Sequence, residues 1–209
     1  MACTAESVAE ALRAVADVVA EHREELIRLD REIGDGDHGE NLARGFTALV
    51  SKLDAEVPSS PGGVLRLAAT TLISTVGGAA GPLYGTAFLR AATSVGDVAA
   101  LDGPAVAAAL RAALDGVVAR GKAALGDKTM VDALIPAVAA AESAAATAGG
   151  VAEVLAVAAD AAGMGAESTA PMVARKGRAS YLGERSAGHL DPGARSTALL
   201  LRTLAGRAR

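Results

Sequence analysis

The feature that most constrains this chain is a helical periodicity that runs through almost all of it. Apolar side chains recur every three or four positions near the N-terminus, as in Val8, Leu12, Val15 and Leu26, which is the spacing of one face of an α-helix. No stretch alternates apolar and polar residues over the length of a strand. Hydrophobic residues make up 51% of the chain, much of this alanine, with two Phe, two Tyr and no Trp, a composition typical of closely packed helices. We therefore predict an all-α protein.

Local signals predict where the helices begin. Capping residues, prolines in a first turn and glycine breaks mark these positions. The predicted starts are Thr4 or Ser7, Gly39 to Asn41, Ser60-Pro61, Asp102-Gly103-Pro104, Thr129, Val151 and Asp191-Pro192. The first helix should continue to Asp30, and Pro136 should kink or restart the helix that contains it. We expect about eight helices in one domain spanning residues 1–209.

The chain has no sequence feature of a secreted or membrane protein. Residues 67–89 carry no charge, but four glycines and Pro82 within them favour two short buried helices joined by a glycine loop. Acidic residues occupy the N-terminus, where a signal peptide would be basic. Cys3 is the single cysteine, so no disulfide forms within the chain and a reducing compartment is indicated. We expect a cytoplasmic protein that does not bind membranes.

Charge is unevenly distributed along the chain. The net charge is −4, yet the segment from Arg175 onward has eight basic and two acidic residues, so it carries +6 and the remainder −10. Basic and aromatic residues do not alternate as they do in nucleic-acid-binding segments, so we expect no nucleic-acid partner. A basic patch that faces phosphate groups beside an acidic metal site is the better interpretation.

Three aspartates lie within eight residues, at Asp30, Asp35 and Asp37, and glycines flank the last two. Carboxylates held about 6 Å apart repel by roughly 3 kcal/mol per pair at an effective dielectric constant near 20. Bound cations would offset this cost, and oxygen ligands favour magnesium, manganese or calcium over zinc. Phosphate oxygens commonly complete the coordination of magnesium. The cluster thus predicts a metal–nucleotide site, the alternative being a solvated acidic turn.

Two nucleotide-binding fingerprints occur here without the context they require. Gly34-x-Gly36-x-x-Gly39 matches the dinucleotide pattern, but aspartates at its variable positions would repel a bare pyrophosphate, and no strand–helix–strand unit surrounds it. Gly116-x-x-x-x-Gly121-Lys122 resembles a phosphate loop, but Ala123 replaces the required hydroxyl residue. Neither match predicts the corresponding fold.

Further segments are candidates for ligand contact. His38 is suited to contacting a phosphate or supporting the metal ligands, and Asn41 falls in the first turn of a helix, where free amides bind anions. The glycines of residues 76–85 allow close approach of a ligand, or equally close helix packing. The basic run 175–185 is suited to binding phosphate through an arginine, or is a solvated loop.

Four motifs taken together resemble the nucleotide-binding L subunits of bacterial dihydroxyacetone kinases. They are LDREIGDGDHGEN, SxVGGAAGPLYGT, RGKAALGDKTMxDALIP and ARKGRASYLGERSAGHLDPGARS, and the similarity covers essentially the whole chain. The resemblance implies an antiparallel eight-helix barrel that holds ADP or ATP and two Mg²⁺ ions at one end.

The resemblance also implies specific roles for residues. Asp30, Asp35 and Asp37 would be the magnesium ligands. The nucleotide would be lined by His38, Gly39, Glu40, Asn41, Gly78, Ala79, Ala80, Gly121, Thr129, Met130, Arg178, Asp191, Pro192 and Gly193. Many relatives carry serine where this chain has Ala80, so backbone amides or water must act there instead. No residue of this chain is expected to serve as a nucleophile or substrate base.

Partners and activity follow from the same resemblance. A separate K subunit would bind the triose, and an M subunit carrying a phosphohistidine would rephosphorylate the bound nucleotide. Two alternatives stay open. The chain could serve another acceptor, such as a different keto-sugar or a fatty acid carrier, or it could be a regulatory module that senses nucleotide state and docks on a transcription factor.

Overall fold

Nine α-helices and one short 3-10 segment form most of the computed structural model, which describes residues 3–208. The elements are β1 (Cys3–Thr4), α1 (Ala5–Glu21), α2 (Arg23–Ile33), α3 (His38–Ala55), α4 (Pro61–Thr75), α5 (Ala80–Val95), β2 (Ala100–Leu101), α6 (Gly103–Gly121), α7 (Met130–Ala146), α8 (Val151–Ser168), η1 (Arg178–Ser186) and α9 (Pro192–Arg207). The two strands are two residues each and pair antiparallel. The prediction of an all-α protein is confirmed.

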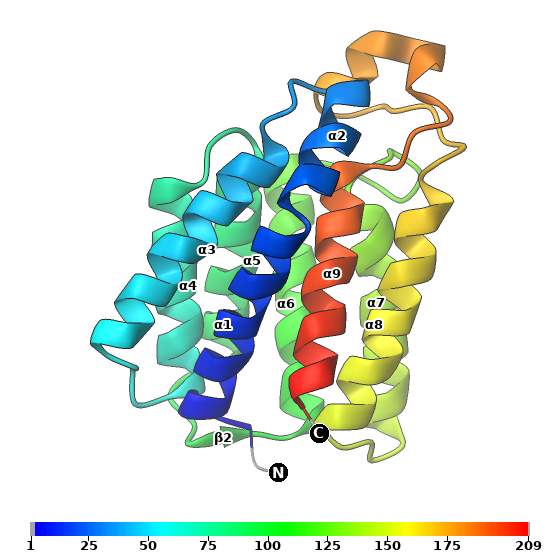
Figure 1. The fold of residues 1–209 in the computed structure, drawn as a ribbon. Coiled ribbons are helices and arrows are strands. Elements are labelled where there is room, and N and C mark those ends of the chain that lie inside the picture. The colour runs from blue at the N-terminus through cyan, green and yellow to red at the C-terminus, as the bar shows by residue number, and fades with distance from the viewer. Residues whose placement is uncertain (1–2, 209) are drawn as a thin grey trace.

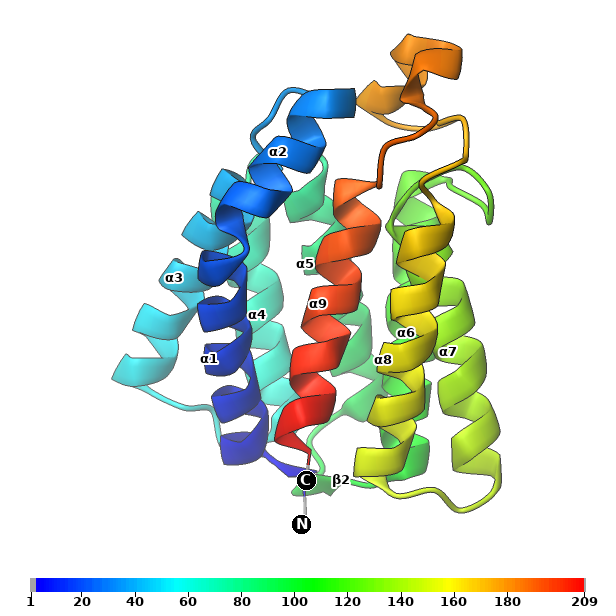
Figure 2. The ribbon, with the colours of Figure 1, turned by 45° about the vertical axis from the view of Figure 1, so that its right-hand side comes forward.

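The helices form a closed barrel (Figures 1 and 2). From α3 to α9, each helix packs against the next in sequence, and α1 packs against both α3 and α9, which closes the ring. Successive helices run in opposite directions, so their connections alternate between the two ends of the barrel. With α1 and α2 counted as one interrupted helix, the ring has the eight members that the resemblance implies.

The first helix is interrupted, which the sequence did not predict. α1 ends at Glu21, and α2 restarts after His22 and leans across the end of the barrel (Figure 2). The His22 ring bonds Glu25, and Glu25 in turn accepts from Arg195 of α9 at 2.8 Å. These contacts hold α2 against α9. Because the apolar spacing continues across the break, periodicity alone does not reveal it.

The predicted helix starts are confirmed by capping contacts. Ser60, Asp102 and Asp191 each accept a hydrogen bond from the amide three residues later, and Thr129 forms a capping box with Asp132. Pro136 neither ends nor restarts its helix, since α7 is continuous from Met130 to Ala146. A proline cannot donate to the carbonyl four residues earlier. That carbonyl, of Asp132, instead lies against α8, where a Cβ at Gly165 would approach its oxygen to 2.4 Å.

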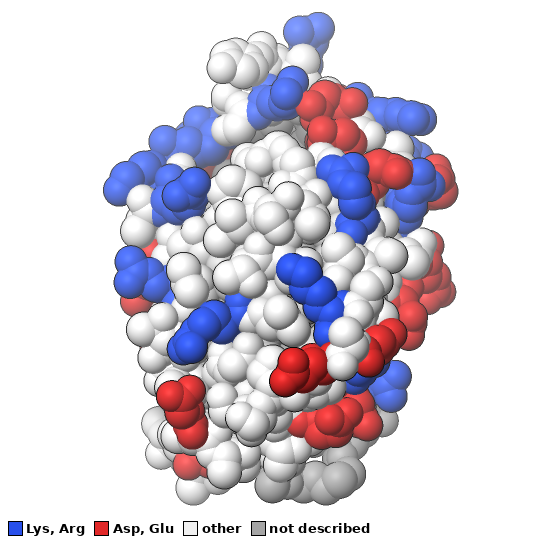
Figure 3. Space-filling view, turned by 90° about the vertical axis from the view of Figure 1, so that its left-hand side faces the viewer, with Lys and Arg blue, Asp and Glu red and all other residues white. Residues whose placement is uncertain are grey.

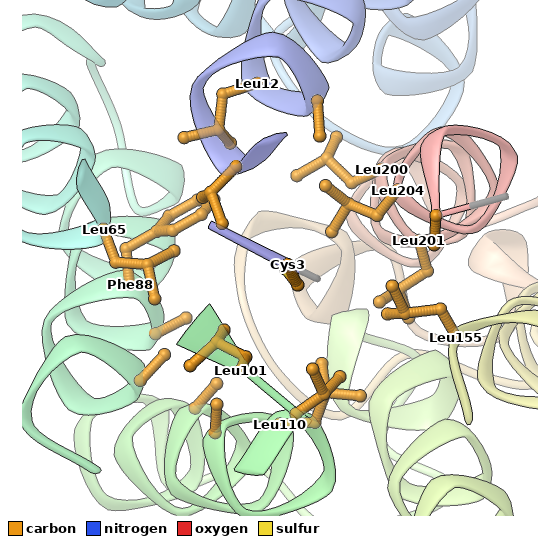
Figure 4. Close-up of a pocket in the computed structure, with 18 of the residues that line it drawn as sticks. Cys3, Leu12, Leu65, Phe88, Leu101, Leu110, Leu155, Leu200, Leu201 and Leu204 are labelled. Atoms are coloured by element: carbon orange, nitrogen blue, oxygen red, sulfur yellow. The ribbon is translucent and has the colours of Figure 1, made fainter. Parts of the chain in front are cut away.

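The lower half of the barrel encloses an apolar cavity of about 310 Å³. Figure 4 shows leucines from α1, α4, α6, α8 and α9 pointing into it, with Phe88 on α5 and Cys3 on β1. Tyr84 and Met130 line this cavity and also a second cavity at the opposite end. These two side chains therefore separate the apolar interior from the site described below.

Charge is unevenly distributed over the side of the barrel that bears α3 and α4. Figure 3 shows that basic side chains gather near the top of this face, while acidic side chains lie mainly towards its lower part and its right-hand edge. The uncharged stretch 67–89 is divided between α4 and α5, as predicted. Within residues 3–208, no helix combines the length and apolar character that crossing a membrane requires.

Candidate functional site

The second cavity, of about 200 Å³, opens at the end of the barrel where α2 and η1 lie. Four helices begin at this cavity, and the first residue of each lines it: His38 of α3, Ala80 of α5, Met130 of α7 and Pro192 of α9. Each helix N-terminus carries partial positive charge and unpaired amides, which favour an anion. The up-and-down topology accounts for this convergence, because alternate helices must start at the same end.

The three clustered aspartates meet at the rim of the cavity. Asp30 lies on α2, Asp35 in the following loop, and Asp37 directly before α3, and they offer carboxylate oxygens within 4.8 Å of one another. Asp30 Oδ2 accepts hydrogen bonds from the amides of Asp37, at 2.8 Å, and His38, at 3.1 Å. A Cβ at Gly34 would lie 2.2 Å from Asp30 Oδ1, so this turn requires glycine there.

The cluster fits a hard divalent cation. Its donors are carboxylate oxygens that converge on one point, which is the donor type that Mg²⁺ prefers. Arg178 already places a cation beside this set, with Nη2 3.0 Å from Asp35 Oδ2. Asp30 is buried whereas Asp35 and Asp37 are exposed. The exposed pair leaves room for phosphate oxygens to share a bound ion.

The glycine loop before α5 serves both packing and the cavity. A Cβ at Gly77 would lie 2.9 Å from Oδ1 of the buried Asn41, so this glycine lets α3 approach the loop. Gly78 lines the cavity with φ of 63°, a backbone conformation that glycine adopts without strain. Close helix packing therefore explains Gly77, and close approach of a ligand is possible at its neighbour Gly78.

Asp191 connects the start of α9 to the end of α8 through hydrogen bonds at the cavity wall. Its Oδ2 accepts from the amide of Ala194 at 2.7 Å, and its own amide donates to Thr169 Oγ1 at 3.0 Å. Burial, with a smaller contribution from the nearby Asp132 carboxylate, raises the pKa of Asp191 to about 7. The amides of Ala194 and Gly193 and the ammonium group of Lys128 act in the opposite direction.

Sequence analysis did not single out Lys128, which lines the cavity from beneath. Its side chain is buried, and Nζ donates to the carbonyls of Thr169 at 2.8 Å, Ala170 at 3.2 Å and Met172 at 3.1 Å, and also to that of His189. This ammonium group joins the C-terminal end of α8 to the segment before α9. No periodic pattern points to it, because its acceptors are backbone atoms far away in sequence.

Sequence analysis also did not single out the hydroxyl groups behind His38. Ser196 Oγ is 2.9 Å from His38 Nε2 and 2.7 Å from the hydroxyl of Tyr84. Ser196 and Tyr84 are buried. Burial lowers the pKa of His38, although Asp30 and Asp37 act in the opposite direction.

All but three of the residues that the resemblance assigned to metal or nucleotide line this cavity. Gly39 instead packs against α2, where a Cβ would lie 2.3 Å from Arg23 O. Glu40 pairs with Arg23 on the exterior. Gly121 ends α6 beside Leu83. These three positions stand behind or beside the cavity and do not form its wall.

Known proteins resemble this chain in sequence and in fold. The DAK2 domain family matches residues 32–206. The chain is 46% identical over 189 residues to the ADP-binding subunit DhaL of the PEP-dependent dihydroxyacetone kinase of Escherichia coli K12, covering 90% of each chain. It is 42% identical over 186 residues to the ADP-binding subunit DhaL of PEP-dependent dihydroxyacetone kinase 1 of Listeria innocua, covering 89% of this chain and 88% of that one.

A solved structure shares the barrel. The dihydroxyacetone kinase of C. freundii in complex with AMP-PNP and Mg²⁺ aligns with a TM-score of 0.72 and 27% identity. The alignment covers 99% of this chain and 34% of that kinase. This chain therefore spans about a third of the length of that enzyme.

Proposed function

Because the chain belongs to the DAK2 domain family, we propose that it is the ADP-binding subunit of a PEP-dependent dihydroxyacetone kinase. One observation carries this proposal: three carboxylates and four helix N-termini meet at one cavity. Carboxylates favour cations, and helix N-termini favour anions. A magnesium-bound nucleotide carries both kinds of charge, and the three aspartates would hold its metal.

The proposal assigns a task to each part of the wall. Asp30, Asp35 and Asp37 hold two Mg²⁺ ions, while the N-terminal ends of α3, α5, α7 and α9 face the nucleotide. Three carboxylates and ADP bring about −6 against +4 from two ions, and Arg178 offsets part of the remaining deficit. Bound magnesium neutralises charge on the transferring phosphoryl group. The chain's own residues supply positioning and electrostatic stabilisation.

The acceptor binds elsewhere in this proposal. Among the described residues that line the cavity there is no serine or cysteine to act as a nucleophile. The phosphoryl group passes to dihydroxyacetone on a separate K subunit, and a phosphohistidine on an M subunit restores ATP from the ADP that stays bound. The similar proteins of E. coli and L. innocua are named as subunits of PEP-dependent kinases, which supports this division of labour.

Reconstitution with purified partners tests the activity. We expect phosphate from PEP to reach dihydroxyacetone only when this chain, the K subunit and the M subunit with its phosphate donors are all present. Full activity with ATP and the K subunit alone, with rapid nucleotide exchange, would contradict the relay. Transfer to another keto-sugar but not to dihydroxyacetone would show that the acceptor is a different keto-sugar. Binding of a transcription factor without any transfer would favour the regulatory alternative.

The variant Asp35→Ala tests the metal assignment, with Asp54→Ala as its control. Asp54 is an exposed carboxylate far along α3 that pairs with Arg13. We expect Asp35→Ala to abolish magnesium-dependent retention of ADP while circular dichroism shows unchanged helical content, and Asp54→Ala to retain ADP. Unchanged ADP affinity in Asp35→Ala, measured by calorimetry, would refute the assignment.

A further inference from the structure

A buried chain of hydrogen bonds runs from the barrel interior to His38. The hydroxyl of Tyr84 on α5 is 2.7 Å from Ser196 Oγ and 3.0 Å from Thr197 Oγ1, both on α9. Ser196 Oγ is in turn 2.9 Å from His38 Nε2 at the start of α3. One connected group of polar atoms therefore links three of the helices that begin at the cavity.

The Gly193 carbonyl holds the hydroxyl groups of this network in place. It accepts from Thr197 Oγ1 at 2.8 Å and from Ser196 Oγ at 3.0 Å, and a carbonyl oxygen can accept two hydrogen bonds. Tyr84 contacts both hydroxyl groups from α5, and burial raises the pKa of Tyr84 to about 12, so its phenol group keeps its proton. Helix α9 and Tyr84 together therefore fix Ser196 Oγ beside His38.

The network contacts one of the two ring nitrogens of His38. Ser196 Oγ lies against Nε2, so it fixes the orientation of the ring. Within the described part of the chain, Nδ1 of His38 has no hydrogen-bond partner. His38 also lines the cavity, so Nδ1 is the ring nitrogen left to contact a bound nucleotide.

We propose that Tyr84 and Ser196 are positioning residues, which hold the His38 imidazole through Nε2 so that Nδ1 meets the bound nucleotide. The proposal rests on the proposed nucleotide-binding function. Neither residue needs to touch the ligand, since both act through the ring of His38. Tyr84 is suited to this task because it stands between the two cavities, with its ring part of the apolar packing and its hydroxyl in the polar network.

The test uses Ser196→Ala, Tyr84→Phe and the double variant in the full-length chain. The control is Thr203→Ala, which removes an α9 hydroxyl that bonds only a backbone carbonyl, that of Leu199 at 2.8 Å. Two quantities are measured at a single neutral pH: the Kd for ADP with Mg²⁺, by calorimetry, and the imidazole ¹⁵N shifts of His38. The shifts are assigned by replacing His22 and His189 with glutamine.

The expected wild-type spectrum shows a change at Nδ1 of His38 when nucleotide is added. Ser196→Ala should change the Nε2 signal of the nucleotide-free chain and bind ADP roughly threefold to tenfold more weakly, the effect of losing one hydrogen bond. Tyr84→Phe should change both quantities in the same direction by less. The double variant should match Ser196→Ala, because both residues act through one ring, and Thr203→Ala should match the wild type.

Three results would overturn the proposal: a His38 Nδ1 signal that does not respond to nucleotide, an unchanged Kd in Ser196→Ala, or losses that multiply in the double variant. A Kd change of the same size in Thr203→Ala would also overturn it, because the effect would then follow from helix stability alone. Failure of the wild-type chain to bind Mg²⁺ and ADP would instead refute the proposed function. The Nε2 signal of the nucleotide-free chain, compared between the wild type and Ser196→Ala, would still decide the positioning role.

Discussion

Arg178 Nη2 lies 3.0 Å from Asp35 Oδ2, so the basic segment η1 places its guanidinium against the acidic loop between α2 and α3. Arg178 is 70% exposed, and exposed ion pairs contribute little to stability. The pair matters because Asp35 belongs to the candidate metal cluster. A metal ion bound at this cluster would compete with Arg178 for the same carboxylate, and the released guanidinium would be free to bind phosphate.

This competition predicts opposite effects in Arg178→Gln. Affinity for Mn²⁺ alone, used as a probe of the magnesium site, should rise about twofold to fivefold because the competing cation is removed. Affinity for ADP with Mg²⁺ should fall by about tenfold, the effect of losing one charge-assisted hydrogen bond. Calorimetry measures both, with Arg185→Gln on the same segment as the control. Changes of the same sign in the two affinities would contradict this interpretation.

A substitution at Ala80 is expected to increase the affinity for ADP. It is the first residue of α5 and lines the cavity. In Ala80→Ser we expect ADP to bind roughly twofold to tenfold more tightly, because a hydroxyl is added beside the phosphates. Adenosine is the control ligand and should bind equally to both proteins. An equal gain for adenosine would place the new hydroxyl away from the phosphates.

Replacement of Lys128 is expected to cause a large loss of stability. Replacing it with methionine removes the donor to the carbonyls of Met172 and His189, whereas the carbonyls of Thr169 and Ala170 keep the amides of Met172 and Gly188. We expect Lys128→Met to lower the free energy of unfolding by roughly 2–4 kcal/mol, since unpaired buried acceptors are costly. Urea denaturation measures this, with the exposed Lys122→Met as the control. A loss below 0.5 kcal/mol would show that water replaces the ammonium group.

Asp191 predicts a dependence of stability on pH. Burial raises the pKa of Asp191 from its ordinary value of 3.8 to about 7 in the folded protein. Between these values the folded protein binds a proton that the unfolded chain releases, so the free energy of unfolding falls as pH rises. The slope contributed by this group approaches about 1.4 kcal/mol per pH unit.

The variant Asp191→Asn isolates this contribution, because an amide oxygen can still cap α9. Denaturation is measured at pH 5, 6, 7 and 8. The free energy of unfolding should decrease less with rising pH in the variant than in the wild type. Relative to the wild type, the variant should therefore gain stability towards pH 8. Parallel stability profiles for the two proteins would show that Asp191 is already ionised across this range.

Local physics explains why much of this protein could be predicted from its sequence. Helix starts such as Asp102 and Thr129 depend on side chains that bond amides two or three residues away, and periodicity reports which face of a helix is buried. The convergence of Asp30, Asp35 and Asp37 is local for the same reason, since these residues lie on one short turn. His22 is the exception, because the break there depends on contacts between α2 and α9.

The sequence by itself determined the helices, the acidic turn and the motifs that mark a nucleotide site. Only the tertiary structure decided which residues meet there. The closed antiparallel ring brings the first residues of α3, α5, α7 and α9 to one cavity, and it leaves Gly39, Glu40 and Gly121 outside the cavity wall. It also brings Ser196 and Tyr84 to His38, and four distant carbonyls to Lys128. These contacts join residues far apart in the chain, so their geometry exists only once the barrel has closed.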